Sequence, residues 1–482
     1  MSLHATTTPE AQAKLDAQRR NASISSFTIA ILFCALIIAI LFYIALKPIF
    51  KNNEPILTYA STSETPDKPK KPEMKNEVTK KPTKPSSSIS KVITASISSP
   101  ISIPVPETDP TEPSLDFGDD EDFGDPNAGS SGSPSIPFLP RDSSKRCSKK
   151  DRLDRLKKEG GKEDYEDQVV NALRWLQKNQ AADGSWKAQG KPVAMTGLAL
   201  LAYLGHCETP ASQEFGETVQ NAIIYLINVS QKNGGKLATN TAEKHWCYEH
   251  AIATYAIAEA YTLCKVFKIP MPGLEESVQA AGNHIIGSQH DSGGWDYAYD
   301  TSGTRGGDTS IACWHLQALK ACKTTKIEFN GLDKCAKKGI KYLEGAKNDK
   351  GTIGYGTTGN NLAHGPTMTS GGALCFQQWG KGNRSLTRNA IKWISSTNEF
   401  DYKKEANLYM HYYSSQAMIN TRGKAWTDYN KKTMANLADA QNPDGSWSLP
   451  GGAAHGMSSK HYATCLSTLM MEVYYRFLPS SE

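Results

Sequence analysis

Histidine, tyrosine and acidic side chains recur at the starts of a set of apolar helical segments in the C-terminal two-thirds of the chain. The members of this set that could bind or react are Tyr248, His250, Asp308, Ser310, His411, Tyr412, His461 and Tyr462. Unpaired backbone N–H groups at a helix start attract negative charge, so side chains gathered there could hold an anionic group or transfer protons. Each of them could equally be a structural side chain that makes its hydrogen bonds within the fold.

Asp308 is the first candidate for an acid. Asp296 and Asp300 lie shortly before it in the sequence, and His461 is the second candidate for a catalytic group. Asp308 directly precedes a helical run that begins Thr-Ser, a position typical of an N-cap residue, whose side chain accepts a backbone hydrogen bond. The sequence therefore predicts a capping role for Asp308, with acid chemistry in a cavity as the alternative.

The helices that would position these side chains belong to an internal repeat of about 45 to 60 residues. In each copy an amphipathic helix is followed by a turn, in most copies glycine-containing, and then by a second helix that is apolar on nearly all sides. The copies begin near Asn171, Asn221, Ala281, Ala336, Asn389 and Thr433. A helix with one polar face lies at a surface, whereas a helix without one must be covered on both sides. The repeat predicts an all-α fold, an (α/α)6 toroid of six helical hairpins over residues 165–479, with an open solenoid as the alternative.

Two turn motifs carry a resemblance to a known superfamily. QAADGSW at 180–186 and QNPDGSW at 441–447 resemble the QW-type repeats of the terpene cyclase and protein prenyltransferase superfamily. The phrases CYEHAIATYAIAEAY, SGGWDYAYD and YATCLSTLMMEVYYRFLP are similar to a narrower group of bacterial membrane-anchored proteins with prenyltransferase/squalene-oxidase repeats (squalene cyclase-like). The resemblance implies a toroid with a central cavity, and for the narrower group it implies no established reaction. The turn residues are expected to be structural, with glycine supplying the backbone angles and tryptophan packing between hairpins.

The catalytic residues of that superfamily are incomplete in this chain. Squalene-type cyclases use an Asp-x-Asp-Asp motif as general acid, and the repeat region contains none. Protein prenyltransferases hold zinc through Asp, Cys and His; the matching positions here are Asp308, Ser310 and His461, and serine is a poor zinc ligand. Cys375 and Gln378 have the spacing of a thioester turn but lack its glycine and glutamate. No cofactor or metal site is therefore predicted, and whether the chain is an enzyme stays open.

The N-terminal third has a different composition and predicts a membrane tether. Residues 27–46 are apolar and uncharged, are long enough as a helix to cross a bilayer, and follow a short tail at 1–26. Residues 47–160 are rich in Lys, Pro and Ser and contain an acidic stretch, a composition that favours a disordered linker. Basic residues before the span favour a single-pass protein with a cytoplasmic N-terminus and an extracytoplasmic toroid.

Cysteine usage and charge narrow the functional classes. The ten cysteines include no CxxC pair and are expected to be free thiols, most of them in the helical core. The net charge of +5 comes mostly from the linker, so no nucleic-acid partner is predicted. The leading expectation is a membrane-anchored binding or scaffold module for a lipid, peptide or protein partner. The alternative is an isoprenoid-handling enzyme, terpene cyclase- or prenyltransferase-like, whose acid departs from the family motif.

Overall fold

The computed structural model describes residues 145–348, 350–357, 365–397, 400–451 and 459–476. The chain divides into two compact units, Met1–Pro106 and Glu107–Glu482, and every described residue belongs to the second. The predicted span at 27–46 and most of the predicted linker lie outside the described residues. Among the helices that are described, none is long and apolar enough to cross a membrane.

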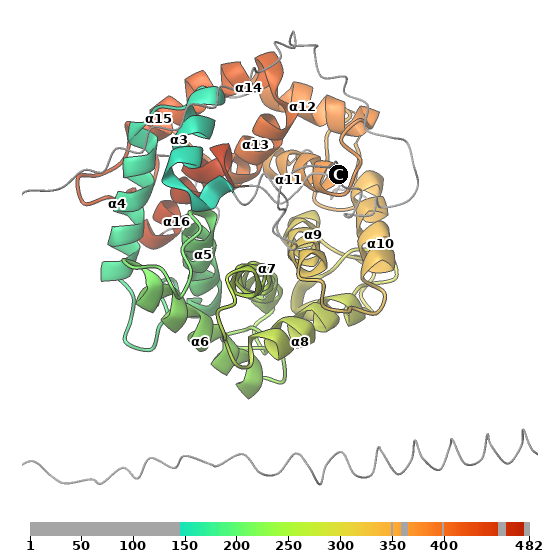
Figure 1. The fold of residues 1–482 in the computed structure, drawn as a ribbon. Coiled ribbons are helices and arrows are strands. Elements are labelled where there is room, and N and C mark those ends of the chain that lie inside the picture. Colours follow the sequence, from blue (N-terminus) through green and yellow to red (C-terminus); the bar gives the residue numbers. More distant parts are fainter. Residues whose placement is uncertain (1–144, 349, 358–364, 398–399, 452–458, 477–482) are drawn as a thin grey trace, which may run out of the picture. The chain divides into compact units, whose positions relative to one another are not determined.

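The described part of the chain is helical, and its helices alternate between an outer and an inner layer (Figure 1). The outer helices are α4 (Asp164–Lys178), α6 (Gly216–Lys232), α8 (Leu274–Gly287), α10 (Leu332–Gly345) and α12 (Ser385–Thr397), followed by α14 (Gly423–Tyr429), the π-helical turn η4 (Asn430–Met434) and α15 (Ala435–Ala438). The inner helices are α5 (Pro192–Gly205), α7 (Trp246–Val266), α9 (Thr309–Thr324), α11 (Pro366–Gln378), α13 (Leu408–Thr421) and α16 (Lys460–Met471). Over the described ranges there is no strand, only isolated bridges. The predicted all-α class is confirmed.

The inner helices form a closed ring. Each packs against the next inner helix along the chain, and the last, α16, packs against the first, α5 (Figure 1). Burial follows the two layers: every residue of α5 from Val193 to Gly205 is buried, whereas α4 buries only part of its surface. The helix that is apolar all round is thus the covered one, as its composition predicts.

The glycine turns join each hairpin to the next outer helix. Gly184 and Gly445 have φ angles of 85° and 88°, which glycine adopts without strain. A Cβ on Gly184 would lie 2.3 Å from the backbone oxygen of Asn221 in α6, and one on Gly445 would lie 2.3 Å from that of Asn171 in α4. The last turn therefore makes with the first outer helix the contact that the first turn makes with the second.

The glutamine and tryptophan of the same motif complete this joint. The Nε2 of Gln441 donates to the Gln168 carbonyl oxygen in α4 at 2.8 Å, and in the first copy Gln180 donates to α6 in the same way. The indole Nε1 of Trp447 donates to the Leu437 carbonyl oxygen at 2.9 Å. The predicted structural role of the turn motif is confirmed, and the motif now accounts for ring closure as well.

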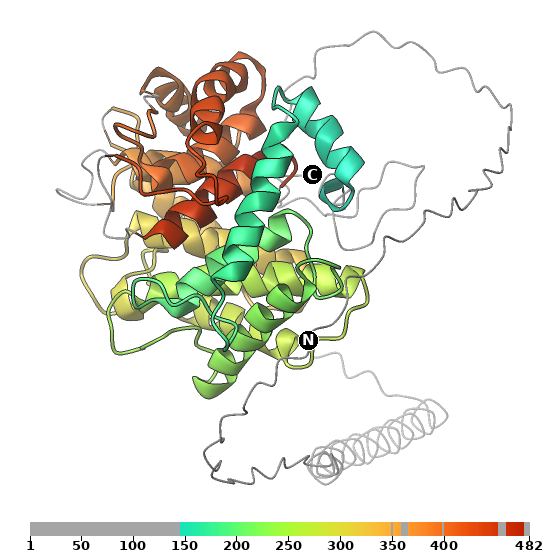
Figure 2. The same cartoon turned by 90° about the vertical axis from the view of Figure 1, so that its left-hand side faces the viewer.

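Residues 145–160, which the sequence assigned to the linker, are folded and cover one end of the ring; they are called the cap below. The cap contains the short helix η1 (Lys145–Cys147) and α3 (Lys149–Lys158). Leu156 is fully buried, and the Glu159 carbonyl oxygen accepts a hydrogen bond from Trp426 Nε1 in α14 at 2.8 Å. The side view in Figure 2 shows α3, in teal, at one edge of the ring. The linker boundary was wrong because a charged side chain of α3, Arg152, is paired inside the fold instead of being solvated.

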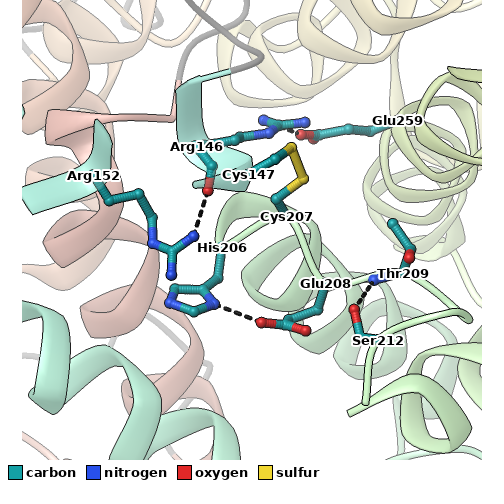
Figure 3. The surroundings of a disulfide bond; sticks show 9 residues. All are labelled: Arg146, Cys147, Arg152, His206, Cys207, Glu208, Thr209, Ser212 and Glu259. Atoms are coloured by element: carbon teal, nitrogen blue, oxygen red, sulfur yellow. Dashed lines mark hydrogen bonds and ion pairs between the residues drawn. A yellow bond between two sulfur atoms is a disulfide. The ribbon is translucent and has the colours of Figure 1, made fainter. Parts of the chain in front are cut away.

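A disulfide joins the cap to the ring. Cys147 is bonded to Cys207, just past the end of α5, and their Cα atoms are 4.9 Å apart (Figure 3). The expectation of free thiols was wrong for this pair, because Cys147 was placed in a linker with no fixed neighbour. The seven other cysteines of the described residues are free and buried.

Candidate functional site

The starts of the inner helices lie at one end of the ring, and their ends lie at the other. Each inner helix is reached through an outer helix that runs in the opposite direction, so all inner helices point the same way (Figure 1). The cap contacts Cys207 after α5 and the short helix η5 (Glu472–Tyr474) after α16. It therefore covers the end opposite to the predicted site.

Asp308 caps α9, as the sequence predicts. Its Oδ1 accepts hydrogen bonds from the Ser310 backbone N–H at 2.8 Å and from the Ser310 hydroxyl at 2.5 Å, and its Oδ2 is paired with Arg305. The Arg305 guanidinium also lies 3.4 Å from Asp296 Oδ1 and 4.6 Å from the centre of the Tyr297 ring. Both carboxylate oxygens of Asp308 are engaged, and two aspartates share one guanidinium.

Tyr248 is hydrogen-bonded to Ser310, the residue that donates to Asp308. Its hydroxyl lies 2.6 Å from Ser310 Oγ, and because Ser310 donates to Asp308, Tyr248 donates to Ser310. Burial, and then the charge of Asp308 and the nearby Tyr409, raise the pKa of Tyr248 well above its ordinary value. Burial and, among smaller effects, the same aspartate also raise the pKa of Tyr409. The starts of α7, α9 and α13 thus lie close to one another.

Partly exposed tyrosines dominate this end of the ring, and they are called the tyrosine face below. The tyrosine face consists of Tyr248, Tyr297, Tyr355, Tyr409 and Tyr462. Tyr412, also predicted for this site, instead lies behind the face: it is fully buried, its ring is stacked on Trp314 with centroids 5.4 Å apart, and its hydroxyl donates to Gln317 at 3.2 Å. The predicted set therefore separates into an accessible group and a supporting group.

His250 occupies a threonine position of the repeat. Its Nδ1 accepts the backbone N–H of Leu237 at 2.9 Å, and its Nε2 donates to the Ala281 carbonyl oxygen at 3.1 Å. In the first hairpin, the hydroxyl of Thr196 accepts the corresponding N–H, from Trp186, and threonines do so in two later hairpins. Burial lowers the pKa of His250 well below its ordinary value, so the ring is neutral. Aligning the copies on their turn glycines would have revealed this role.

His411 and His461 are also engaged within the core. The Nε2 of His461 lies 3.1 Å from the Met195 carbonyl oxygen, and burial lowers the pKa of His461 to about 4. The Nδ1 of His411 lies 2.9 Å from the Tyr429 hydroxyl, and burial lowers the pKa of His411 to about 3. Among the described residues no hydrogen bond or shared partner links either histidine to Asp308. Over the same ranges, no three His, Cys, Asp or Glu side chains lie close enough to hold a metal ion.

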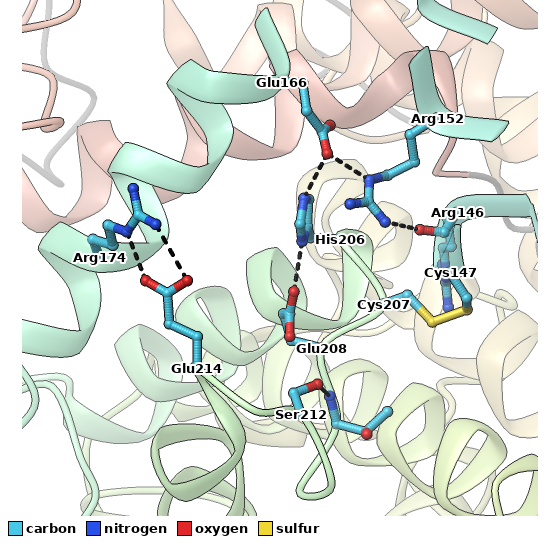
Figure 4. A network of polar contacts seen from close by, with 11 residues as sticks. Arg146, Cys147, Arg152, Glu166, Arg174, His206, Cys207, Glu208, Ser212 and Glu214 are labelled. Atoms are coloured by element: carbon cyan, nitrogen blue, oxygen red, sulfur yellow. Dashed lines mark hydrogen bonds and ion pairs between the residues drawn. A yellow bond between two sulfur atoms is a disulfide. The ribbon is translucent and has the colours of Figure 1, made fainter. Parts of the chain in front are cut away.

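A second polar cluster, which the sequence did not predict, lies beneath the cap (Figure 4). The Nε of Arg152 donates to Glu166 at 2.8 Å, and its Nη1 donates to the Arg146 carbonyl oxygen at 2.6 Å. His206 lies between two carboxylates, 3.1 Å from Glu166 and 2.7 Å from Glu208. Burial opposes the charge on His206, but the two carboxylates outweigh it and raise its pKa. Despite its own burial, Glu166 has a lowered pKa because His206 and Arg152 stabilise its charge.

Three more charged side chains meet beside this cluster. Glu259 of α7 binds Arg146 at 2.8 Å and Arg476 at 2.7 Å, and all three side chains are buried. Glu472 is fully buried, neither of its carboxyl oxygens has a hydrogen-bond partner, and burial raises its pKa well above the ordinary value. Burial of this kind favours the protonated form of a carboxyl group. A charged residue inside an apolar helix, as Glu259 is within AIAEAY, was the sequence signal for this cluster.

No family model matches the chain, and no curated protein matches it. Similar solved structures include a GH76A alpha-1,6-mannanase from Salegentibacter sp. HEL1_6, with 10% identity and a TM-score of 0.49, covering 66% of this chain and 100% of that one. A type II terpene cyclase from Scytonema has 12% identity and a TM-score of 0.42, covering 68% of this chain and 99% of that one. The neighbours thus include the superfamily that the turn motifs resemble and also a mannanase, and similarity at this level assigns no activity.

Proposed function

We propose that this chain is a ligand-binding toroid of six helical hairpins, anchored in a membrane by residues 27–46, and that its ligand binds to the tyrosine face. The main support is a contrast between two sets of side chains at that end of the ring. The tyrosines are partly exposed, whereas Asp308, His250 and His461 already have partners. Groups that could transfer a proton are buried and paired, whereas the tyrosine side chains keep part of their surface exposed.

The ligand class that fits best is an extended polypeptide segment of a protein partner. A tyrosine side chain combines an apolar ring with a hydrogen-bonding tip, and aromatic-lined surfaces recognise extended proline-rich peptides. An anionic ligand, which bare helix starts would attract, is disfavoured here because Asp308 already fills the start of α9. A lipid tail would bind best to a surface of aliphatic side chains, whereas this face presents five phenol groups.

Peptide binding by the full-length protein in detergent tests this proposal. A panel of short, uncharged, proline- and aromatic-containing peptides is titrated by fluorescence anisotropy. We expect micromolar binding by part of the panel and a loss of about tenfold or more in the double variant Tyr409→Ala/Tyr462→Ala, since two stacking contacts are removed. The matched control is Tyr225→Ala, a partly buried tyrosine of the outer helix α6. Equal binding by the control and the double variant would rule out the tyrosine face.

The membrane placement has its own support and its own test. A structural disulfide forms and persists in an oxidising compartment, which fits a toroid outside the cytoplasm. Cells are quenched in acid, thiols are alkylated without reduction, and peptides are mapped by mass spectrometry. Cys147 and Cys207 should be recovered as one linked peptide pair. Recovery of both as alkylated thiols would place the toroid in a reducing compartment.

One observation favours a second candidate, an isoprenoid-handling enzyme whose acid departs from the family motif. Glu472 of η5 is fully buried and its carboxyl oxygens have no hydrogen-bond partner; burial raises its pKa well above the ordinary value, and a carboxyl group with a raised pKa can act as a proton donor. Under this candidate, the full-length protein converts squalene or geranylgeraniol into cyclic products seen by gas chromatography and mass spectrometry. The isosteric variant Glu472→Gln would abolish them while keeping the helical circular dichroism spectrum. If the wild-type protein forms no product from either compound, the candidate fails.

A further inference from the structure

At one junction of the ring, between α16 and α5, the chain does not run from one inner helix to the next through an outer helix. Between other neighbouring inner helices the chain passes directly through an outer helix, but α16 meets α5 only through non-covalent contacts, among them that of His461 Nε2 with the Met195 carbonyl oxygen at 3.1 Å. Hydrogen bonds across this junction join α4 to α15 and the last turn, through Gln168 to the Ala438 carbonyl oxygen at 3.0 Å and Gln441 to the Gln168 carbonyl oxygen at 2.8 Å. This junction, called the seam below, is therefore the place where the ring can open without breaking the chain.

The cap spans the seam. On the side of the first hairpin, it is attached through the Cys147–Cys207 disulfide and the Arg152–Glu166 ion pair (Figures 3 and 4). On the side of the last hairpin, the Gly160 carbonyl oxygen accepts a hydrogen bond from the Asn430 side chain of η4 at 2.8 Å. The same short segment thus holds both flanks of the seam.

We propose that the cap is a clasp set by oxidation: formation of the Cys147–Cys207 disulfide locks the cap across the seam and completes the closure of the ring. The two thiols lose two protons and two electrons as the S–S bond forms, and a disulfide donor accepts them and becomes a dithiol. Reduction by a dithiol runs the same exchange backwards and frees the clasp. This role is independent of the ligand proposed for the tyrosine face.

The closed cap needs a covalent bond because its polar contacts are incomplete. The Nε atoms of Arg146 and Arg476 and both carboxyl oxygens of Glu472 are buried without a hydrogen-bond partner. Water could hydrogen-bond to these atoms if the cap opened. Their desolvation in the closed state therefore opposes closure. Polar pairing and desolvation therefore oppose one another, and the disulfide shifts the balance towards the closed cap.

The effect of the bond can be scaled from the loop that it closes. When the cap opens and the ring stays folded, the bond closes only the stretch of chain between Cys147 and the start of α4 at Asp164. The chain-entropy relation for a loop of about 15 residues corresponds to a shift of about a hundredfold in the equilibrium between closed and open cap. Hydrogen exchange measures this equilibrium directly, because amides of α3 exchange through opening.

The experiment compares full-length oxidised protein in detergent with the same sample after folding and then treatment with dithiothreitol. Hydrogen exchange followed by mass spectrometry should show protection in α3 falling by up to about a hundredfold on reduction. Protection should also fall in α4 and α16, which flank the seam, and stay unchanged in α9 and α11 on the far side of the ring. The double variant Cys147→Ser/Cys207→Ser should resemble reduced wild-type protein and ignore dithiothreitol.

Two results would overturn the proposal. If α3 keeps its protection after reduction is verified by mass, the disulfide does not hold the clasp. If α9 and α11 lose protection as much as α4 and α16, the disulfide stabilises the whole domain and not the seam. Reduction after folding keeps the test valid even if the serine double variant does not fold.

Discussion

Replacing Gly445 with alanine tests whether the last hairpin closes on the first. An alanine at the observed φ of 88° costs about 1–2 kcal/mol for its left-handed backbone. Its Cβ would also lie 2.3 Å from the Asn171 backbone oxygen, so the turn or α4 must move, at a cost of about 1–3 kcal/mol more. The expected loss in the free energy of unfolding is therefore about 2–5 kcal/mol.

Two other glycines provide matched controls. Gly380 has a φ of 70°, but nothing lies within 4 Å of its added Cβ, so Gly380→Ala should lose only the backbone cost of about 1–2 kcal/mol. Gly184 makes the same 2.3 Å contact with α6, within one continuous stretch of chain, so Gly184→Ala should lose about as much as Gly445→Ala.

The assay is thermal unfolding of the oxidised full-length proteins, followed by circular dichroism. For a folded region of about 330 residues, each kcal/mol shifts Tm by about 1.5 °C. Gly445→Ala and Gly184→Ala should then melt a few degrees below Gly380→Ala. If Gly445→Ala melts with Gly380→Ala while Gly184→Ala melts lower, the last turn does not touch α4 and the closed ring is wrong.

Substitutions at three further positions test individual roles. His250→Thr should lose less stability than His250→Leu, because a threonine hydroxyl can accept the Leu237 N–H as Thr196 accepts that of Trp186; His250→Leu leaves this N–H without an acceptor and should be about 1–3 kcal/mol less stable than His250→Thr, read from urea midpoints. The free energy of unfolding of Asp308→Asn should exceed that of Asp308→Ala by more than about 0.5 kcal/mol. The reason is that asparagine caps a helix as well as aspartate does, and alanine does not. The raised pKa of His206 means that its protonated form stabilises the fold below its unfolded pKa of about 6.5, and that this contribution is lost as the pH rises through the folded value. The urea midpoint should therefore fall as the pH rises above about 6.5, and His206→Gln should remove that part of the fall; an unchanged slope in the variant would contradict the pairing with Glu166 and Glu208.

The repeat pattern predicted the fold because its signals are local. The motif around Trp447 contains the glycine that needs a positive φ, the glutamine that reaches the next outer helix and the indole that returns to its own helix. The copies around Trp186 and Trp295 repeat these contacts, so the periodicity of the sequence carries the architecture. Capping by Asp308 was predictable for the same reason, since an N-cap depends on its immediate neighbours.

The cap and the buried ion pairs were missed because they depend on contacts between distant parts of the chain. Arg146 meets Glu259 and, through it, Arg476, and no local pattern links these three positions. Charged residues such as Arg152 made the cap look like solvated linker, although their partners lie inside the ring. The role of His250, in contrast, could have been read from the repeat. His250 was proposed as a site residue, but it takes a structural position that threonine fills in other copies.

The position of Cys147 has a mechanical consequence. The chain that precedes residue 145 enters the folded domain only two residues before this cysteine, so tension on that chain passes through the sulfur–sulfur bond directly into the end of α5. The hydrogen bonds of α3 then carry none of the load, and the helix is shielded from being peeled off the ring. The tyrosine face lies at the opposite ends of the inner helices. A pull at the attachment point can therefore reach it only through the length of those helices.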